Sequence, residues 1–305
     1  MHAHAHAGHD HAHHHHHDAP APNDKRYSIA IALNLGFVVL EGAAAFVANS
    51  TALFSDAAHN LSDVLGLALA GGATWLASRE SSERRTYGYA KATVLAALAN
   101  ALALFAACGG ILWEAIHRFT QPETVSAPIV MAAAGIGVVL NGATALLFLR
   151  GRDRDVNVRG AYLHMLGDAG VSAAVIVAAL VIMVTHAQWI DPLVSVGVVA
   201  LILWSTWGLL RESLDLAMDA APAHIDVAAV RAFLCKQPGV TAVHDLHIWA
   251  MGASDTALTA HLVRPEGSDD QFLVDVTCAL EQEFAIHHAT FQVEREHRPD
   301  CGGHA

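Results

Sequence analysis

The sequence has few charged residues and few cysteines. Only 15% of its 305 residues are Asp, Glu, Lys or Arg, whereas 54% are hydrophobic. Because an average soluble domain carries about 25% charged residues, this chain is too apolar for an ordinary soluble protein of its length. Its four cysteines, at positions 108, 235, 278 and 301, form no C-x-x-C pair. That spacing excludes a dense disulfide framework and agrees with a reducing compartment.

Six long apolar segments occupy most of the first 210 residues. A bilayer core about 30 Å thick requires roughly 20 apolar residues per helix, and each segment reaches that length. We therefore expect a six-helix transmembrane domain over residues 25–210, in contact with a lipid bilayer. The approximate spans are 27–48, 53–77, 92–117, 126–149, 160–184 and 189–210.

Basic residues are concentrated in alternate connections between these segments. One set of connections carries Lys25, Arg26, Arg79, Arg84, Arg85, Lys91, Arg150, Arg152, Arg154, Arg159 and Arg211, and the opposite set carries Arg118. Lys and Arg accumulate in cytoplasmic loops, so a bacterial-type inner membrane protein with both termini in the cytoplasm is predicted. The net charge of −12 comes mainly from the region after Arg211, and we expect no nucleic-acid partner.

Both ends of the chain differ in composition from the apolar region. Residues 1–24 are rich in histidine with almost no apolar bulk, so a disordered cytosolic tail is expected, either concentrating metal or acting as a low-affinity buffer. Residues 211–297 follow the pattern helix, strand, strand, helix, strand, which predicts a small cytosolic α/β domain. An open strand edge would favour dimerisation. Residues 298–305 are expected to be a flexible tail.

Two of the apolar segments each carry a histidine four residues before an aspartate, as His59 with Asp63 and His164 with Asp168. On an α-helix, residues i and i+4 share one face. Ionisable groups within a membrane are costly and normally face the interior of a helix bundle. Two imidazoles and two carboxylates from facing helices would supply a tetrahedral shell for Zn²⁺.

Other interpretations of these residues stay open. Each His and Asp could form a structural hydrogen-bonded pair, or the four could relay protons without a metal. The histidine-rich tail favours metal, and imidazole favours Zn²⁺, Cd²⁺, Co²⁺ and Ni²⁺ over Mg²⁺ or Ca²⁺. Asp56 could be an outer-shell partner of His59 that accepts its second ring N–H, or a wetted carboxylate near the helix start.

With these motifs the sequence resembles the cation diffusion facilitator family, and in particular its zinc-transporting branch. The resemblance is carried by Leu53–Asp63, Thr86–Gly88, Glu114–Arg118 with Pro122, Ala161–Asp168, Asp191–Ser195 and Val243–Trp249. It implies a homodimer of six-helix protomers, each with a C-terminal cytosolic ferredoxin-like α/β domain. It also implies proton-coupled antiport of a divalent metal by alternating access, with the metal on His59, Asp63, His164 and Asp168.

The resemblance further implies a regulatory zinc site in the cytosolic domain. Its residues would be His244, His261, His288 and Glu294, and bound metal would bridge or stiffen the dimer. The chain departs from the family pattern at Lys91 and Thr93, where Arg and Glu are expected. Any contact built on that missing carboxylate is in question, whereas the bilayer site is unaffected.

Two other functions compete with transport. A membrane-embedded zinc hydrolase would use a similar His/Asp site with an open position, and Glu41 is the nearest candidate general base. A metal sensor would use the helices only as an anchor, for which six helices with paired internal ligands are more than is required. We therefore expect a secondary transporter that exports zinc from the cytoplasm, and not an enzyme.

Overall fold

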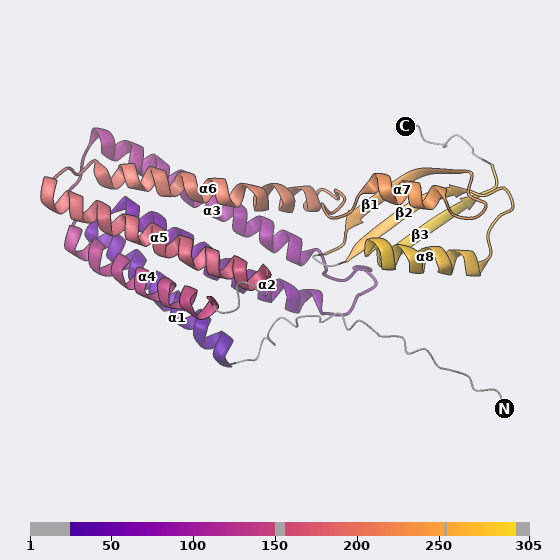
Figure 1. The fold of residues 1–305 in the computed structure, drawn as a ribbon, viewed down its shortest axis with the longest axis horizontal. Coiled ribbons are helices and arrows are strands. Elements are labelled where there is room, and N and C mark those ends of the chain that lie inside the picture. Colours follow the sequence, from indigo (N-terminus) through magenta and orange to yellow (C-terminus); the bar gives the residue numbers. More distant parts are fainter. Residues whose placement is uncertain (1–24, 150–155, 253–254, 297–305) are drawn as a thin grey trace, which may run out of the picture.

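The computed structural model describes residues 25–149, 156–252 and 255–296 of the chain. Six long helices lie side by side at one end of the molecule, and a small α/β domain lies at the other end (Figure 1). The predicted tails, residues 1–24 and 298–305, are outside the described residues. The long helices are α1 (Lys25–Ala48), α2 (Thr51–Ala77), α3 (Ala92–Thr120), α4 (Ala127–Phe148), α5 (Val156–Thr185) and α6 (Ile190–Ala217).

Four of these helices, α3 to α6, are long and apolar enough to cross a membrane in the part of the chain that the structure describes. In α1 the apolar helical stretch is the shorter Asn34–Ala48, and in α2 the site residues interrupt the apolar sequence. The expectation of membrane crossings is thus confirmed for four helices, while α1 and α2 stay predicted crossings. Large apolar side chains such as Phe46, Leu147 and Trp204 are exposed, as contact with lipid requires.

Hydrogen bonds join the N-terminus of α2 to the N-terminus of α6. Ser50 caps α2 by accepting a hydrogen bond from the Leu53 N–H at 3.1 Å. The carboxylate of Asp191, on the first turn of α6, accepts hydrogen bonds from the backbone N–H and the hydroxyl of Thr51 at 2.7 and 2.8 Å. Since the first N–H groups of a helix have no partner within the helix, this buried carboxylate both caps α2 and fixes it against α6.

Helix α2 is central in the bundle, in contact with α1, α3, α5 and α6. Gly66 allows the close approach of α3, because a Cβ atom at this position would lie 2.9 Å from Asn100 Nδ2. Around the N-terminal end of α2, small side chains including Ala45, Ala52 and Ala134 form a buried cluster.

The α/β domain follows the predicted order of elements. It contains α7 (Val227–Cys235), β1 (Ala242–Ala250), β2 (Thr256–Val263), α8 (Asp270–Phe284) and β3 (His288–Glu294). Strand β2 is central, antiparallel to β1 and parallel to β3. Apolar residues of β2, α7 and α8, among them Leu234, Leu258 and Leu280, form its core. Helix α6 continues to Ala217, beyond the membrane end expected near residue 210.

The connection between α2 and α3 contacts the α/β domain. Lys91 forms an ion pair with Asp219, which follows α6. Gly252 lies against this connection, and a Cβ atom there would be 3.0 Å from the carbonyl oxygen of Ala90. Lys91 therefore keeps the positive charge of the expected Arg, and its ion pair joins the connection between α2 and α3 to the segment after α6.

Candidate metal sites

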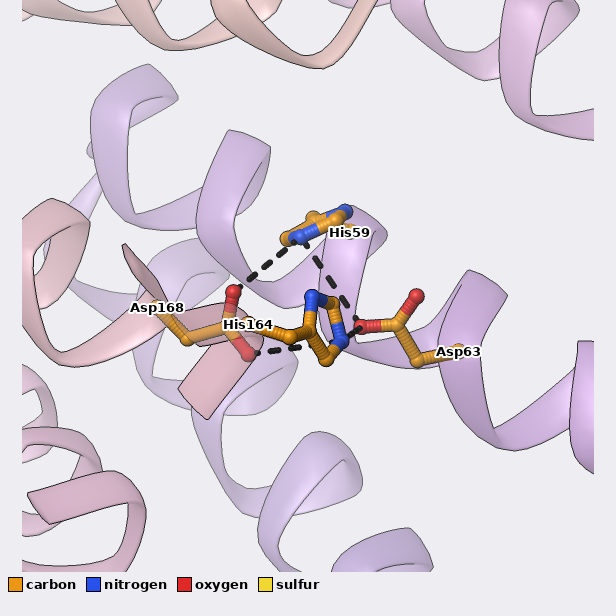
Figure 2. Close-up of side chains that lie close together, drawn as sticks. All are labelled: His59, Asp63, His164 and Asp168. Carbon is orange, nitrogen blue, oxygen red and sulfur yellow. Dashed lines mark ion pairs between the residues drawn. The ribbon is translucent and has the colours of Figure 1, made fainter. Parts of the chain in front are cut away.

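The two predicted His/Asp pairs face each other across α2 and α5 (Figure 2). Helical periodicity puts His59 and Asp63 on one face of α2, and His164 and Asp168 on one face of α5. The Nε2 atom of each histidine lies nearest the aspartate of the other helix. His59 Nε2 is 3.3 Å from Asp168 Oδ1, and His164 Nε2 is 3.2 Å from Asp63 Oδ2. The corresponding distances within each helix are 3.8 and 3.7 Å.

This arrangement matches the requirements of a tetrahedral metal site. One ligand atom from each residue lies within 4.8 Å of all the others. Bonds of about 2 Å to Zn²⁺ place tetrahedral ligand atoms roughly 3.3 Å apart, so only small movements would close the four side chains around an ion. Two nitrogen and two oxygen donors suit Zn²⁺ better than the all-oxygen shells of Mg²⁺ or Ca²⁺.

The candidate site is buried on one side and open on the other. The exposed fractions of the Asp168 and His59 side chains are 6% and 16%, whereas those of Asp63 and His164 are 39% and 45%. The exposed side faces a cavity of about 390 Å³ between α2, α3, α5 and α6. Ser205, Thr206 and Leu209 line the cavity from the part of α6 that leads to the α/β domain. The site is therefore reached from that end of the bundle.

Asp56 occupies a different position from the one predicted. Its side chain is fully buried, so it is not a wetted carboxylate. It accepts a hydrogen bond from the Ser172 hydroxyl at 2.7 Å, while His59 Nδ1 has no hydrogen-bond partner among the described residues. The structure therefore does not show the predicted hydrogen bond from His59 to Asp56. The hydrogen bond to Ser172 instead joins Asp56 to α5.

A second cluster joins the three strands of the α/β domain. His244 Nε2 on β1 is 3.1 Å from one carboxylate oxygen of Glu294 on β3, and His261 Nδ1 on β2 is 3.2 Å from the other. The two imidazole rings pack edge to face with centroids 4.9 Å apart. These three residues could hold a metal ion, because two imidazoles and a carboxylate are typical zinc ligands.

The structure does not bring the fourth predicted residue, His288, into this cluster. His288 begins β3 and lies opposite Ala257, whereas Glu294 ends the strand opposite Val263. Six residues of extended chain at about 3.3 Å each separate the two by roughly 20 Å. His288 is also exposed, so its side chain does not share a site with Glu294 in this chain.

Asp245 is a neighbour of the cluster that the sequence did not identify. Its carboxylate lies 2.9 Å from His247 Nε2 and 3.5 Å from His261 Nε2. The register of β1 shifts between His244 and His247, and Asp245 has a φ of 50°. Such a bulge redirects a side chain, and strand alternation alone does not predict it. In the sequence, His244 and His247 on either side of Asp245 were the feature that could have indicated its role.

The carboxylates of Glu294 and of the neighbouring Asp245 both favour their ionised forms. The hydrogen bond from His247, together with the nearby imidazoles, lowers the pKa of Asp245 below its ordinary value. Partial burial alone would raise the pKa of Glu294, but hydrogen bonds from Gln292 and His244 and the attraction of the imidazoles outweigh it and lower the pKa. An ionised carboxylate beside two imidazoles is the form that ligates a cation.

Comparisons with known proteins extend over nearly the whole chain. The model of the cation efflux transmembrane domain matches residues 28–216, and that of the cytoplasmic domain of cation efflux proteins matches residues 222–296. Zinc transporter ZitB of Escherichia coli (strain K12) is 36% identical over 284 residues, covering 92% of this chain and 90% of that protein. A cadmium, cobalt and zinc/H(+)-K(+) antiporter of Bacillus subtilis is 34% identical over 283 residues, covering 90% of each.

Two further relatives carry the name CzcD. The cation efflux system protein CzcD of an Alcaligenes strain is 35% identical over 274 residues, covering 89% of this chain and 87% of the relative. A solved structure, the metal-bound C-terminal domain of the CzcD transporter from Cupriavidus metallidurans, is 34% identical. It covers 23% of this chain and 99% of its own, with a TM-score of 0.20.

Proposed function

The chain belongs to the cation efflux, or cation diffusion facilitator, family of membrane transporters, and from this premise we propose that it exports zinc from the cytoplasm. The transport site would consist of His59, Asp63, His164 and Asp168. The observation that carries the proposal is the convergence of these four side chains from two helices, with ligand atoms within 4.8 Å of one another. Because the family and its relatives are transporters, the hydrolase and sensor alternatives are set aside.

Zinc is the first choice of substrate. Two imidazole nitrogens and two carboxylate oxygens form the donor set that Zn²⁺ accepts in a tetrahedron. Cadmium, cobalt and nickel ions tolerate the same donors, and relatives are named for zinc, cadmium and cobalt. We therefore propose Zn²⁺ as the main substrate, with Cd²⁺, Co²⁺ or Ni²⁺ as further ones.

Export would be driven by protons that enter as the metal leaves. The ligands must be deprotonated to bind metal, so protons and metal compete for the same lone pairs. Moving two positive charges out against an inside-negative potential costs about 4.6 kcal/mol per 100 mV, at about 2.3 per charge. Each returning proton recovers half of this cost, and one relative is named an antiporter. The cavity on the side of the α/β domain supports a conformation open to the cytoplasm.

The α/β domain would contribute dimerisation and regulation. Strands β1 and β3 form the two edges of its sheet, and exposed strand edges favour pairing with another chain. We propose a homodimer in a bacterial-type inner membrane with both termini cytoplasmic. A regulatory zinc ion would bind His244, His261 and Glu294, with Asp245 beside them, and His288 is left out because of its position on β3.

Transport by reconstituted protein tests the proposal. Vesicles containing the purified full-length chain are loaded at a fixed pH, and radioactive zinc uptake is followed with and without an imposed pH gradient. We expect gradient-dependent uptake by the unmodified protein and none by the Asp63→Ala, Asp168→Ala double variant. Equal uptake with and without the gradient would contradict proton antiport, and full uptake by the double variant would contradict the site.

A further inference from the structure

A second cavity, lined by basic side chains, lies apart from the candidate transport site. The connection from α2 to α3, residues 78–91, lies beside the α/β domain (Figure 1), and the cavity of about 390 Å³ lies between the two. Arg84, Arg85 and Lys91 line it from the connection. Trp249 on β1 and Met251, just after β1, line it from the α/β domain. Among the described residues, no acidic side chain lines this cavity.

Two of these basic side chains keep an uncompensated charge. The Arg84 side chain makes no hydrogen bond or ion pair with any other described residue. Arg85 lies over the ring of Tyr89, 4.7 Å from its centroid, and donates a hydrogen bond to the Tyr89 hydroxyl at 2.9 Å, but neither contact supplies a negative charge. Lys91 is paired with Asp219. The cavity therefore offers two net positive charges to a ligand.

Backbone groups beside the cavity add further donors. The backbone N–H groups of Thr86, Tyr87 and Ala90 make no hydrogen bond within the described part of the chain. Gly88 between them has a φ of 65°, and turns that contain a left-handed residue present N–H groups to anions. Helix α3 begins directly afterwards at Ala92, without a side-chain cap, and its N-terminus adds partial positive charge. Backbone and side chains thus favour the same kind of ligand, an anion.

The cavity lies at the depth of lipid headgroups. Helix α3 has 29 residues and is therefore roughly 43 Å long, whereas the hydrocarbon core of a bilayer is about 30 Å thick. The ends of α3 thus reach the headgroup region, and the cavity lies at one of them. Trp75 and Tyr87 flank the arginines in sequence, and their exposed fractions are 58% and 64%. Exposed aromatic residues of these types are typical of a membrane surface.

The distribution of charge favours an anion that is held in the membrane. The whole chain has a net charge of −12, which repels small anions in solution. The connection from α2 to α3 instead has an excess of basic residues, because it carries Arg79, Arg84, Arg85 and Lys91 against Glu80 and Glu83. A cluster of basic residues directly beside a transmembrane helix is typical of sites for anionic lipids.

We propose that this cavity binds the phosphate group of an anionic phospholipid from the surrounding bilayer. Arg84 and Arg85 are its cationic contacts, and the N–H groups of the turn are its neutral donors. Because Trp249 belongs to the α/β domain, the bound headgroup links that domain to the connection between α2 and α3. Such a site is independent of the metal that the chain transports.

Lipid binding by the full-length protein in detergent tests the proposal. Native mass spectrometry counts the bound lipids as phosphatidylglycerol, or phosphatidylcholine with the same acyl chains, is added. We expect the first phosphatidylglycerol to bind at least about tenfold more tightly than phosphatidylcholine. The Arg84→Gln, Arg85→Gln double variant should lose this preference and bind phosphatidylcholine as before.

A matched control removes two charges from the same end of the bundle but outside the cavity. Arg159 on α5 and Arg211 on α6 are both exposed, and the Arg159→Gln, Arg211→Gln double variant should keep the preference for phosphatidylglycerol. If the first double variant does not fold, Arg84→Gln alone removes a side chain that has no partner among the described residues. We expect this single variant to weaken phosphatidylglycerol binding about threefold or more.

Four results would overturn the proposal. The Arg84→Gln, Arg85→Gln variant could keep the preference, or the control variant could lose it equally, which would indicate a general attraction between basic surfaces and anionic lipids. Equal affinity of the unmodified protein for both lipids would show that the cavity does not recognise negative charge. Glycerol phosphate, a soluble analogue of the headgroup, could bind as tightly as phosphatidylglycerol, which would assign the cavity to a free anion.

Discussion

His59 Nε2 lies 3.3 Å from Asp168 Oδ1 on a different helix, closer than the 3.8 Å that separates it from Asp63 Oδ2 on its own helix. His164 shows the same relationship to Asp63. The site is therefore a property of how α2 and α5 are placed, and neither helix provides it alone. A shift of one helix against the other would open the site, which is what alternating access requires.

Replacing Asp168 by alanine should abolish zinc transport. The variant loses a buried charged ligand and leaves His59 without its nearest partner, so we expect at least about a tenfold loss of zinc affinity, or roughly 1.4 kcal/mol. Zinc uptake into vesicles measures the effect. Asp215→Ala on α6 makes the same chemical change at an exposed surface ion pair with Arg211 and should transport normally. Retained uptake by Asp168→Ala would remove Asp168 from the ligand set.

Replacing His164 by aspartate should change which metals are transported. The substitution keeps four ligands but reduces the nitrogen donors to one, which favours ions that prefer oxygen. We expect zinc transport to decrease and tolerance of Cd²⁺ or Mn²⁺ to increase, as measured by competition between metals for uptake. An unchanged order of preference would argue against His164 as a ligand.

Replacing Asp191 by asparagine should destabilise the bundle without touching a metal ligand. The charged acceptor of the Thr51 N–H and hydroxyl is lost, and hydrogen bonds to charged groups contribute about 1.5–3 kcal/mol. Denaturant unfolding in detergent measures the loss. Asp269→Asn changes another N-cap, which accepts from the Phe272 N–H at the start of α8. Asn caps helices about as well as Asp, so this control should differ little from the unmodified protein.

The contribution of Glu294 to the stability of the folded protein should be lost in acid. The pKa of Glu294 is lowered in the folded chain, so the unfolded chain binds more protons near the ordinary value. Its contribution is complete above about 4.5 and is lost as the pH falls through the lowered folded pKa. Thermal unfolding of the full-length protein from neutral to acidic pH should show this decline, and Glu294→Gln should reduce it. A decline just as steep in Glu294→Gln as in the control Glu266→Gln would contradict this assignment.

Two histidines of the α/β domain should differ in their effect on zinc stoichiometry. His261→Ala removes a member of the three-residue cluster, whereas His288→Ala changes an exposed residue at the far end of β3. We expect the full-length His261→Ala variant to bind one zinc ion fewer per chain in equilibrium dialysis. His288→Ala should bind as many ions as the unmodified protein. The opposite result would restore the ligand set expected from the family.

Several predictions from sequence depended only on local regularities. The i and i+4 spacing of His59 with Asp63, and of His164 with Asp168, places each pair on one helical face whatever the rest of the fold does. Length and hydropathy likewise predicted α3 to α6 as membrane helices. The order of elements in the α/β domain followed from turn residues and from changes in apolar periodicity.

Other features depended on contacts between distant segments. His288 and Glu294, six positions apart, were predicted to share one site, but β3 is extended along its whole length and separates them. The position of Asp245 depended on a bulge in β1, and the partner of Asp56 depended on Ser172, which is 116 residues away in sequence.

The sequence by itself determined that this chain has apolar helices carrying two identically spaced His and Asp pairs, because hydrophobicity and helical periodicity act over a few neighbouring residues. Only the tertiary structure decided that the two pairs converge, that His288 lies apart from its expected partners, and that Asp56 is buried against Ser172. The physical reason is that convergence and burial depend on how helices pack. Helix packing sums many weak contacts between residues far apart in the chain, and no single segment encodes it.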